Sequence, residues 1–317
     1  MLVSDAYEKF MDYGRTYWAP GSISYYERNL GYFFRYLEQV YERPVDQIDV
    51  SLLPDDILFQ YVIWLRSKNR YSNHPLSNKM CVNGKIKSNT VNAYMRAVKA
   101  FFNHLYQARI VDHQFTDGLK LPRSDYDQIV PLLSQEVDLI DSLFDQELPN
   151  DLRNLCIIHL MLDAGLRSCE VISLTAGNVI FASGTIVINR SKGDKSRVVI
   201  MAPKLAALLR KYMDIFHPHG LMFKKVNANE PIDSSVFNAL FKRLRRNTGI
   251  GRLHPHLLRH TFATSYIMGG GNLEKLRILL GHSDYSVTRM YLHLAVQYQI
   301  MDADIYRLDP VFFKSSY

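Results

Sequence analysis

The chain has few cysteines and no long apolar run. Its 317 residues include only Cys81, Cys156 and Cys169, an odd number at wide spacing, so we expect neither a disulfide framework nor a cysteine-based metal site. No apolar stretch approaches the roughly 20 residues that a membrane-spanning helix needs, and the first residues lack the pattern of a signal peptide. These absences predict a reduced, cytoplasmic protein without a membrane partner.

Acidic residues are missing from one long segment. Residues 57–111 contain no Asp or Glu but nine Lys or Arg, and residues 201–260 contain 11 Lys or Arg against three acidic residues. A basic segment in a chain of net charge +7 can simply be a solvated face. Two separate basic segments, one in each half, favour a nucleic acid that is gripped from two sides.

The first part of the chain has the apolar spacing of helices. Helical periodicity covers residues 23–41, 55–68 and 88–109, and a polar, basic loop at 67–88 lies between the last two. In the helix at 88–109 we expect an inward face of Val91, Tyr94, Val98, Phe101, Phe102 and Leu105. We predict a helical domain over residues 1–116, followed by a proline-containing linker at 117–133.

The second part, residues 134–317, mixes helices with one hairpin. Residues 184–203 alternate as two strands around a Lys-Gly-Asp-Lys turn. Helical patterns are expected at 150–165, 167–175, 204–216, 234–249, 254–270, 272–282 and 286–298. The predicted fold class is therefore mainly α, with a small antiparallel sheet in the second domain.

One helix combines apolar and titratable residues. The stretch HPHLLRHTFATSYIMGG, residues 254–270, places Pro255 at the first helical position. His256 and Arg259 share a face one turn apart, while Leu257, Leu258, Phe262 and Ile267 are expected to face inward. A zinc site and a basic surface helix are the alternatives, but no Cys or Glu-x-x-His frame supports zinc.

Further residues join this helix in a recognisable order. Arg167 and Glu170 stand three apart at the start of a short helix, Lys192 lies in the hairpin turn, His282 follows Leu-Leu-Gly, and Tyr291 comes nine residues later. This order, together with His256 and Arg259, resembles the tyrosine recombinases, also called the phage integrase family. The resemblance covers nearly the whole chain, from a helical core-binding (SAM-like) domain through a linker to a catalytic domain.

The chemistry of phosphodiester exchange explains the arginine and tyrosine residues. The pentavalent centre carries extra negative charge, which the planar guanidinium groups of Arg167 and Arg259 are suited to clamp. Tyr291 is the expected nucleophile, forming a 3′-phosphotyrosyl bond and releasing a 5′-hydroxyl. Because the pKa of a tyrosine is about 10, cations or a base must activate it.

The histidines are given different roles. We expect His256 to act as the base or as a hydrogen-bond partner of Tyr291 or the phosphate, and His282 to donate to a non-bridging oxygen. His260 is expected to pack or to donate a structural hydrogen bond beside Arg259, and His254 to stand at the entry of the helix.

The remaining polar groups complete the expected site. By resemblance, Lys192 protonates the 5′-oxygen that leaves, with Lys195 in the same turn as its rival. Glu170 is expected to orient Arg167 or a neighbouring helix. No paired-carboxylate cluster suited to metal ions is visible, and the phosphotyrosyl bond conserves the energy of the broken bond, so neither a metal nor another cofactor is expected.

The resemblance also implies an assembly on double-stranded DNA with paired recombination sites. The two domains would form a C-shaped clamp, and a homotetramer would exchange strands through a Holliday junction, with the C-terminal tail 295–317 docking on a neighbouring protomer. Packing of this tail within its own protomer is the alternative. The expected DNA-binding residues are Arg66, Lys68, Lys85, Lys87, Arg96, Lys99, Lys242, Arg243 and Arg246.

Several functions remain open on the sequence alone. The long basic loop at 67–88 favours an integrase or transposase of a mobile element, with Xer-type chromosome or plasmid dimer resolution as the alternative. A type IB topoisomerase would use the same tyrosine chemistry as a monomer. A non-catalytic DNA-binding protein on this scaffold is disfavoured, because all six expected catalytic residues are present.

Overall fold

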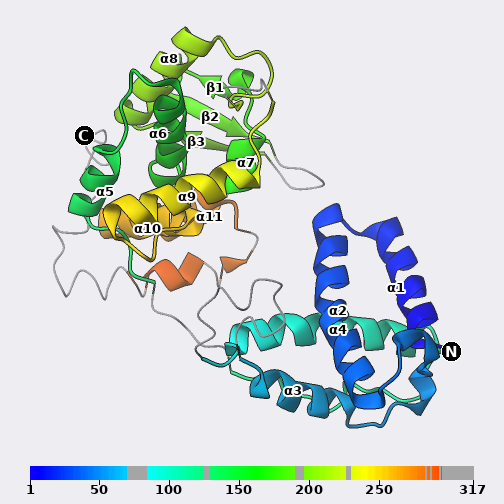
Figure 1. The fold of residues 1–317 in the computed structure, drawn as a ribbon. Coiled ribbons are helices and arrows are strands. Elements are labelled where there is room, and N and C mark those ends of the chain that lie inside the picture. Colours follow the sequence, from blue (N-terminus) through cyan, green and yellow to red (C-terminus); the bar gives the residue numbers. More distant parts are fainter. Residues whose placement is uncertain are drawn as a thin grey trace. The chain divides into compact units, whose positions relative to one another are not determined.

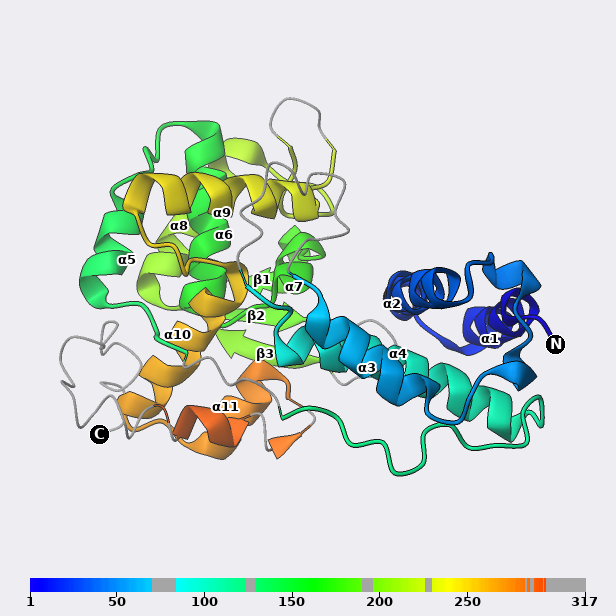
Figure 2. The same ribbon diagram turned by 60° about the horizontal axis from the view of Figure 1, so that its bottom comes forward.

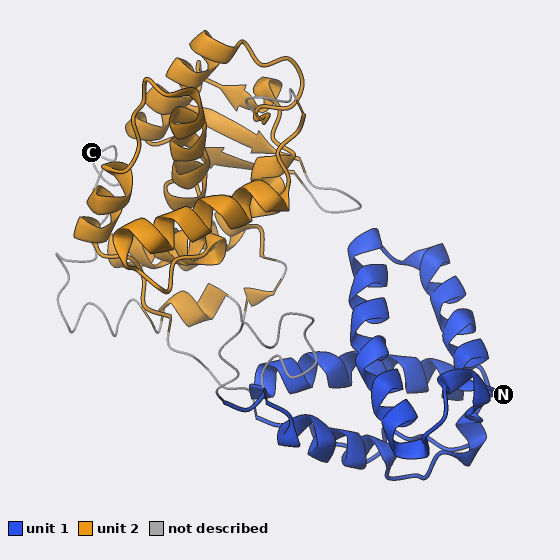
Figure 3. Cartoon of the chain, in the orientation of Figure 1, with its two compact units in different colours: residues 1–127 blue, residues 128–317 orange. Residues whose placement is uncertain are grey.

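The computed structural model describes residues 1–69, 84–123, 129–189, 196–225, 230–282, 284–285, 288–292 and 294. The chain divides into two compact units, residues 1–127 and 128–317 (Figure 3). Leu119 and Leu121 pack on the core of the first unit, whereas Leu132 is buried in the core of the second. Each end of the predicted linker thus contributes to the core of one unit. The predicted domain bounds, 1–116 and 134–317, and the predicted C-shaped clamp on DNA remain predictions.

The described part of unit 1 is entirely helical (Figure 1). α2 begins at Pro20, three residues earlier than the apolar pattern suggests, because proline suits the first helical position. α1 was not among the predicted helices. The elements are α1 (Val3–Tyr17), α2 (Pro20–Tyr41), two 3₁₀ turns (Val45–Gln47 and Val50–Leu52), α3 (Ile57–Ser67) and α4 (Ser88–Gln107).

The core of unit 1 forms around α4, which contacts α1, α2 and α3. α3 lies beside α4 in both views (Figure 2). Phe101 packs edge-on against Phe10 at 5.5 Å between ring centroids, and Phe102 against Phe33 at 5.7 Å. The inward face predicted for residues 88–109 is confirmed at every position except Tyr94, which is half-buried.

Unit 2 is built around one central helix. Its elements are α5 (Ser134–Asp141), α6 (Pro149–Leu162), α7 (Ser168–Ile172), a 3₁₀ turn (Ala176–Asn178), β1 (Val179–Ile180), β2 (Thr185–Ile188), β3 (Arg197–Ile200), α8 (Pro203–Phe216), α9 (Ser234–Thr248), α10 (Pro255–Met268) and α11 (Leu273–Leu280). Every residue of α6 from Asp151 to Leu162 is buried. α8 and α10 both pack against this helix, and α11 packs against α10 and β3.

The three strands form one antiparallel sheet in the order β1-β2-β3. Thr185 pairs with Ile200 and Ile188 with Arg197, which confirms the predicted hairpin. Together with the helices, the sheet confirms the predicted fold class.

A charged group lies inside unit 2. His159 on α6 is 1% exposed, and its two ring nitrogens lie 3.0 Å from Oδ1 of Asp141 and 2.8 Å from Oδ2 of Asp163. Both partners are acceptors, so both nitrogens donate and the ring is an imidazolium. Burial works to lower the pKa of His159, but the two carboxylates raise it to about 9.

Candidate active site

Two backbone carbonyls, one in the turn after α6 and one at the end of α11, hold the guanidinium group of Arg259. Its Nη1 donates to the carbonyl of Gly165 at 2.5 Å, and its Nη2 donates to the carbonyl of Leu280 at 2.6 Å. Gly165 has φ +66°, which allows the chain to turn sharply after α6. Leu280 is the last residue of α11, where unpaired carbonyls and the helix dipole favour a cation. Arg259 is 3% exposed, so its position is set by the fold.

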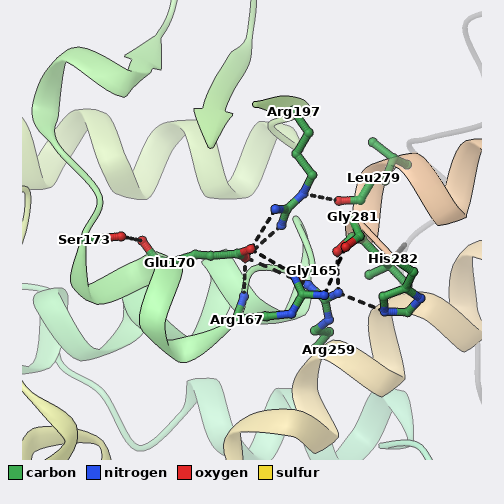
Figure 4. A network of polar contacts seen from close by, with 10 residues as sticks. Gly165, Arg167, Glu170, Ser173, Arg197, Arg259, Leu279, Gly281 and His282 are labelled. Atoms are coloured by element: carbon green, nitrogen blue, oxygen red, sulfur yellow. Dashed lines mark hydrogen bonds and ion pairs between the residues drawn. The ribbon is translucent and has the colours of Figure 1, made fainter. Parts of the chain in front are cut away.

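Three arginines surround the carboxylate of Glu170 (Figure 4). Glu170 accepts from the backbone N–H of Arg167 at 2.7 Å and from its Nη1 at 3.0 Å. Arg197 binds both carboxylate oxygens, at 2.7 and 2.8 Å, and Arg259 lies 4.0 Å away. Although burial works to raise the pKa of Glu170, the hydrogen bonds from Arg197 lower it to about 2.

The cluster has more positive than negative charge. Glu170 is ionised, and three guanidinium groups face it, which leaves two positive charges uncompensated within the cluster. Burial lowers the pKa of Arg259 to about 9, with Arg167 as the next cause, so the group remains protonated at neutral pH. The side chain of Arg167 is 29% exposed and can reach a bound anion. A phosphodiester is a suitable anion, because two guanidinium groups can donate to its non-bridging oxygens.

His282 follows α11 and contacts the same cluster. Its Nε2 accepts from Nη2 of Arg259 at 3.1 Å, so its Nδ1 carries the proton and donates to Oγ1 of Thr288 at 3.0 Å. Burial lowers the pKa of His282 to about 4, with Arg259 and Arg167 as further causes. In this structure Nε2 is an acceptor and the Nδ1 proton is donated to Thr288, so neither ring nitrogen of His282 directs a proton at a phosphate oxygen, and the predicted donation stays a prediction.

Tyr291 is buried beside two histidines. Residues 288–292 are helical, and Tyr291 is 2% exposed. Its hydroxyl lies 2.7 Å from Nδ1 of His260, and its ring stacks on that of His282 at 6.3 Å between centroids. Burial raises the pKa of Tyr291 to about 12, although Arg259 and Arg167 act to lower it.

The comparisons with known proteins agree on one family. Residues 132–298 match the model described as "Phage integrase family". The chain belongs to the phage integrase family. A tyrosine recombinase of Thermosipho africanus is 31% identical over 67% of this chain and 74% of its own length. A tyrosine recombinase XerC of Chlamydia caviae is 25% identical over 81% of this chain and 78% of its own length.

A solved structure shares the fold of this phage integrase family member. The Tn1549 transposon integrase, in complex with a circular intermediate DNA, superposes with a TM-score of 0.70 over 95% of this chain and 99% of that one. The two sequences are 19% identical. The resemblance inferred from the motifs is therefore confirmed as family membership, and the shared fold supports the mainly helical assignment.

The structure brings together four of the six predicted catalytic residues: Arg167, Arg259, His282 and Tyr291. His256 lies one turn before His260 on α10, with 6.5 Å between ring centroids, and it is exposed. Burial lowers its pKa, with Arg259 as the next cause.

Some predictions concern residues outside the described part of the chain. Lys192 and Lys195, the candidates for the general acid, are among them, as are the C-terminal tail 295–317 and most of the basic loop. His254 is described: it precedes the first residue of α10, and its Nδ1 donates to the carbonyl of Arg252 at 2.6 Å.

Two features of the site were missed by sequence reasoning. Arg197 was not singled out, although it occupies an inward position of β3, a strand whose residues alternate between buried and exposed. An arginine at an inward strand position is a usable signal, because a buried guanidinium needs a partner. His260 was expected to pack or to donate structurally beside Arg259, and its contact with the hydroxyl of Tyr291 was not foreseen.

The predicted DNA-binding residues have different surroundings. Arg66, Arg96, Lys242 and Arg246 are exposed. Lys68 lies over the ring of Trp64, Lys85 donates to the carbonyl of Ser67, Lys87 is half-buried, and Lys99 lies 3.4 Å from the carbonyl of Leu119.

Arg243 differs from the other members of this set. It donates to both carboxylate oxygens of Asp151 on the buried helix α6 and lies over the ring of Phe144. These contacts pack Arg243 onto unit 2, but its side chain is 38% exposed, so its assignment to DNA binding stays a prediction.

In the described ranges, no group of three or more His, Cys, Asp or Glu side chains is placed to hold a metal ion. No helix among those residues is both long and apolar enough to cross a membrane.

Proposed function

We propose that the protein is a site-specific DNA recombinase that cleaves and rejoins strands through a 3′-phosphotyrosyl intermediate. The observation that supports this most directly is the cluster of Arg167, Arg259 and His282 beside the buried Tyr291. The cluster supplies positive charge for a phosphodiester, and Tyr291 supplies the nucleophile. Membership in the phage integrase family and relatives named tyrosine recombinases support the same enzyme class.

The reaction follows from these groups. The two arginines bind the non-bridging oxygens of the scissile phosphate and stabilise the charge of the pentavalent transition state. The Tyr291 oxygen forms a bond to phosphorus while the bond to the 5′-oxygen breaks, and the leaving oxygen takes a proton from Lys192, with Lys195 as the alternative donor. Attack of another 5′-hydroxyl reverses these steps and joins new strands. The site acts by charge and position, because Arg167 and Arg259 are already fixed by the carboxylate and carbonyl groups around them.

The basic surfaces of the two units are proposed to hold the DNA. Arg66 and Arg96 of unit 1, and Lys242 and Arg246 of unit 2, are exposed and can contact phosphates. In this proposal residues 1–116 form the core-binding domain and residues 134–317 the catalytic domain. Recognition of the DNA sequence would come from α4 and α9, whose exposed side chains can contact base edges.

We further propose that four protomers assemble on two DNA sites and exchange strands through a Holliday junction. Residues 295–317 would dock on a neighbouring protomer. A variant that lacks residues 297–317 should bind a single DNA site and fail to form tetramers in analytical ultracentrifugation. Unchanged tetramer assembly on DNA would contradict this part of the proposal.

Two biological roles remain candidates. Integration or transposition of a mobile element is the first, and Xer-type dimer resolution is the second, which the XerC relative favours. Recombination sites at the ends of an element that contains the gene would favour the first. A single chromosomal site would favour the second.

The decisive experiment is covalent trapping. The protein is incubated in EDTA with DNA that spans the flanks of its own gene, and adducts resistant to SDS are isolated and mapped. We expect adducts at a discrete site with the wild type and none with Tyr291→Phe. Adducts with the variant would refute the assignment of the nucleophile. Relaxation of a supercoiled plasmid without paired sites would instead indicate a topoisomerase.

A further inference from the structure

The nucleophile has a hydrogen-bond partner that differs from the predicted base. Oη of Tyr291 lies 2.7 Å from Nδ1 of His260, and the two rings lie 5.6 Å apart between centroids. Tyr291 is 2% exposed, and His260 is partly buried on α10. Among the described residues, the structure gives His256 no hydrogen bond to Tyr291. The contact with His260 therefore joins the proposed nucleophile directly to a group that can accept a proton.

The surroundings of this contact explain why a base is needed. Burial raises the pKa of Tyr291 to about 12, so at pH 7 only about one molecule in 10⁵ would carry the phenolate on its own. Burial also lowers the pKa of His260 to about 4, with His256, His254 and Arg259 as further causes. A neutral imidazole that carries its proton on Nε2 has an unprotonated Nδ1, which can accept from the phenol.

DNA would increase the basicity of His260. After burial, the causes of its low pKa are His256, His254 and Arg259, of which Arg259 is charged at neutral pH, and a phosphodiester held by Arg167 and Arg259 introduces a negative charge that offsets this guanidinium. The proton affinity of the imidazole then rises as the substrate binds. The base would thus become effective in the complex in which it is needed.

We propose that His260, rather than His256, is the general base of strand cleavage, which rests on the proposed function of Tyr291. As the bond between Oη and phosphorus forms, the phenolic proton moves to Nδ1 of His260, and the bond from phosphorus to the 5′-oxygen breaks. On rejoining, His260 returns this proton to the departing tyrosine oxygen. His256 is then available for the phosphate.

The test is single-turnover cleavage as a function of pH. The substrate is a nicked duplex that carries the site mapped by covalent trapping, so that religation does not hide cleavage. The comparison includes the wild type and the variants His260→Ala, His260→Asn and His256→Asn. Only variants whose DNA affinity and Tm equal those of the wild type are used. Asn at position 260 keeps a polar acceptor near the tyrosine but cannot take up a proton.

The expected results separate a base from a packing residue. The wild-type rate should be flat between pH 6.5 and 9. Both position-260 variants should be slower at pH 7 by about 10²–10⁴-fold and should gain about tenfold in rate per pH unit, because they depend on free phenolate. His256→Asn should be slower and keep a flat profile.

Other outcomes overturn the proposal. A flat, merely slower profile for the position-260 variants would assign His260 to packing, and a rising profile for His256→Asn alone would make His256 the base. ¹⁵N NMR of the imidazole groups in the full chain gives an independent check, since His260 should carry its proton on Nε2 and none on Nδ1. A failure of the proposed function would be visible separately, as adduct formation by Tyr291→Phe.

Discussion

The ion pair between Arg197 and Glu170 is expected to stabilise unit 2 and to position the catalytic arginines. The two side chains are 5% and 9% exposed, and two hydrogen bonds of 2.7 and 2.8 Å join them. Nε of Arg197 also donates to the carbonyl of Leu279 at 2.6 Å. Substitution Arg197→Met keeps the length of the side chain and removes these three hydrogen bonds together with the charge.

The size of the effect follows from the burial of both groups. Removing one partner of a buried pair leaves the other without compensation, which typically costs about 3–5 kcal/mol. Glu170 retains its contacts with Arg167, so we expect the lower end, about 3 kcal/mol. For a unit of this size the loss corresponds to a decrease in Tm of roughly 6–12 °C. Cleavage should decrease as well, because Glu170 loses one of the groups that hold it in place.

The assay is urea unfolding of the full chain, followed by a double-mutant cycle. Glu170→Gln should also lower the free energy of unfolding, because three guanidinium groups then face one another without a carboxylate. The double variant should lose less than the sum of the single losses, by at least about 1 kcal/mol. Lys211→Met, which breaks an exposed pair with Glu147, is the control and should change stability by about 0–1 kcal/mol.

Two results would refute this reasoning. A loss below about 1 kcal/mol for Arg197→Met would show that the buried pair contributes little net stability, as can happen when desolvation offsets attraction. Additivity of the two substitutions within about 0.5 kcal/mol would show that the residues do not act together.

Three further predictions concern a buried histidine, a glycine turn and two arginines of unit 2. The folded pKa of His159, about 9, exceeds the unfolded value of about 6.5. The stabilisation by His159 is therefore complete below pH 6.5 and is lost as pH rises through 9, by up to about 3 kcal/mol. In urea unfolding, the free energy of unfolding of His159→Gln should vary less across this pH window than that of the wild type. Gly165→Ala should destabilise the protein by about 1–3 kcal/mol, since φ is +66° and the new methyl group would meet a buried phenyl ring at 2.5 Å; an unchanged Tm would contradict the assignment of the turn. Arg243→Ala should lower stability by about 1–3 kcal/mol by removing the ion pair of Asp151, which among the described residues keeps only the hydrogen bond from the backbone N–H of Asp145. Arg246→Ala should reduce the salt dependence of DNA binding more than Arg243→Ala does and leave stability unchanged.

Much of the fold could be predicted because periodicity reports burial. The helix at 88–107 was found from the spacing of apolar residues, and the hairpin of β2 and β3 from the alternation of residues on either side of a Lys-Gly-Asp-Lys turn. α1 was missed, although Val3, Ala6 and Phe10 of this helix are buried. α5 was also missed, since a helix of eight residues offers little more than two turns of pattern. Helix boundaries followed local chemistry, as the start of α2 at Pro20 illustrates.

The site was predictable where motif and spacing coincide, and less so where a partner comes from a distant element. Arg167, Arg259 and His282 were identified from their order along the chain. The pairing of Arg197 with Glu170 joins β3 to α7 across 27 residues, and no local spacing indicates it. An arginine that also pairs with a carboxylate of a buried helix looks like any other arginine of a basic segment, so the pairing of Arg243 with Asp151 was not expected.

The choice between the two histidines of α10 shows most clearly what the sequence lacks. His256 and His260 are four residues apart, so they share one helical face, and spacing alone cannot decide which of them faces the nucleophile. Position along the helix decides it. His256 lies in the first turn and is exposed, whereas His260 lies one turn further in, where the segment that contains Tyr291 packs on α10. A base for a buried phenol must itself reach into the interior, and only the second histidine does so in this structure. The exposed histidine is left at the rim of the site, where it can meet a phosphate that arrives from solvent.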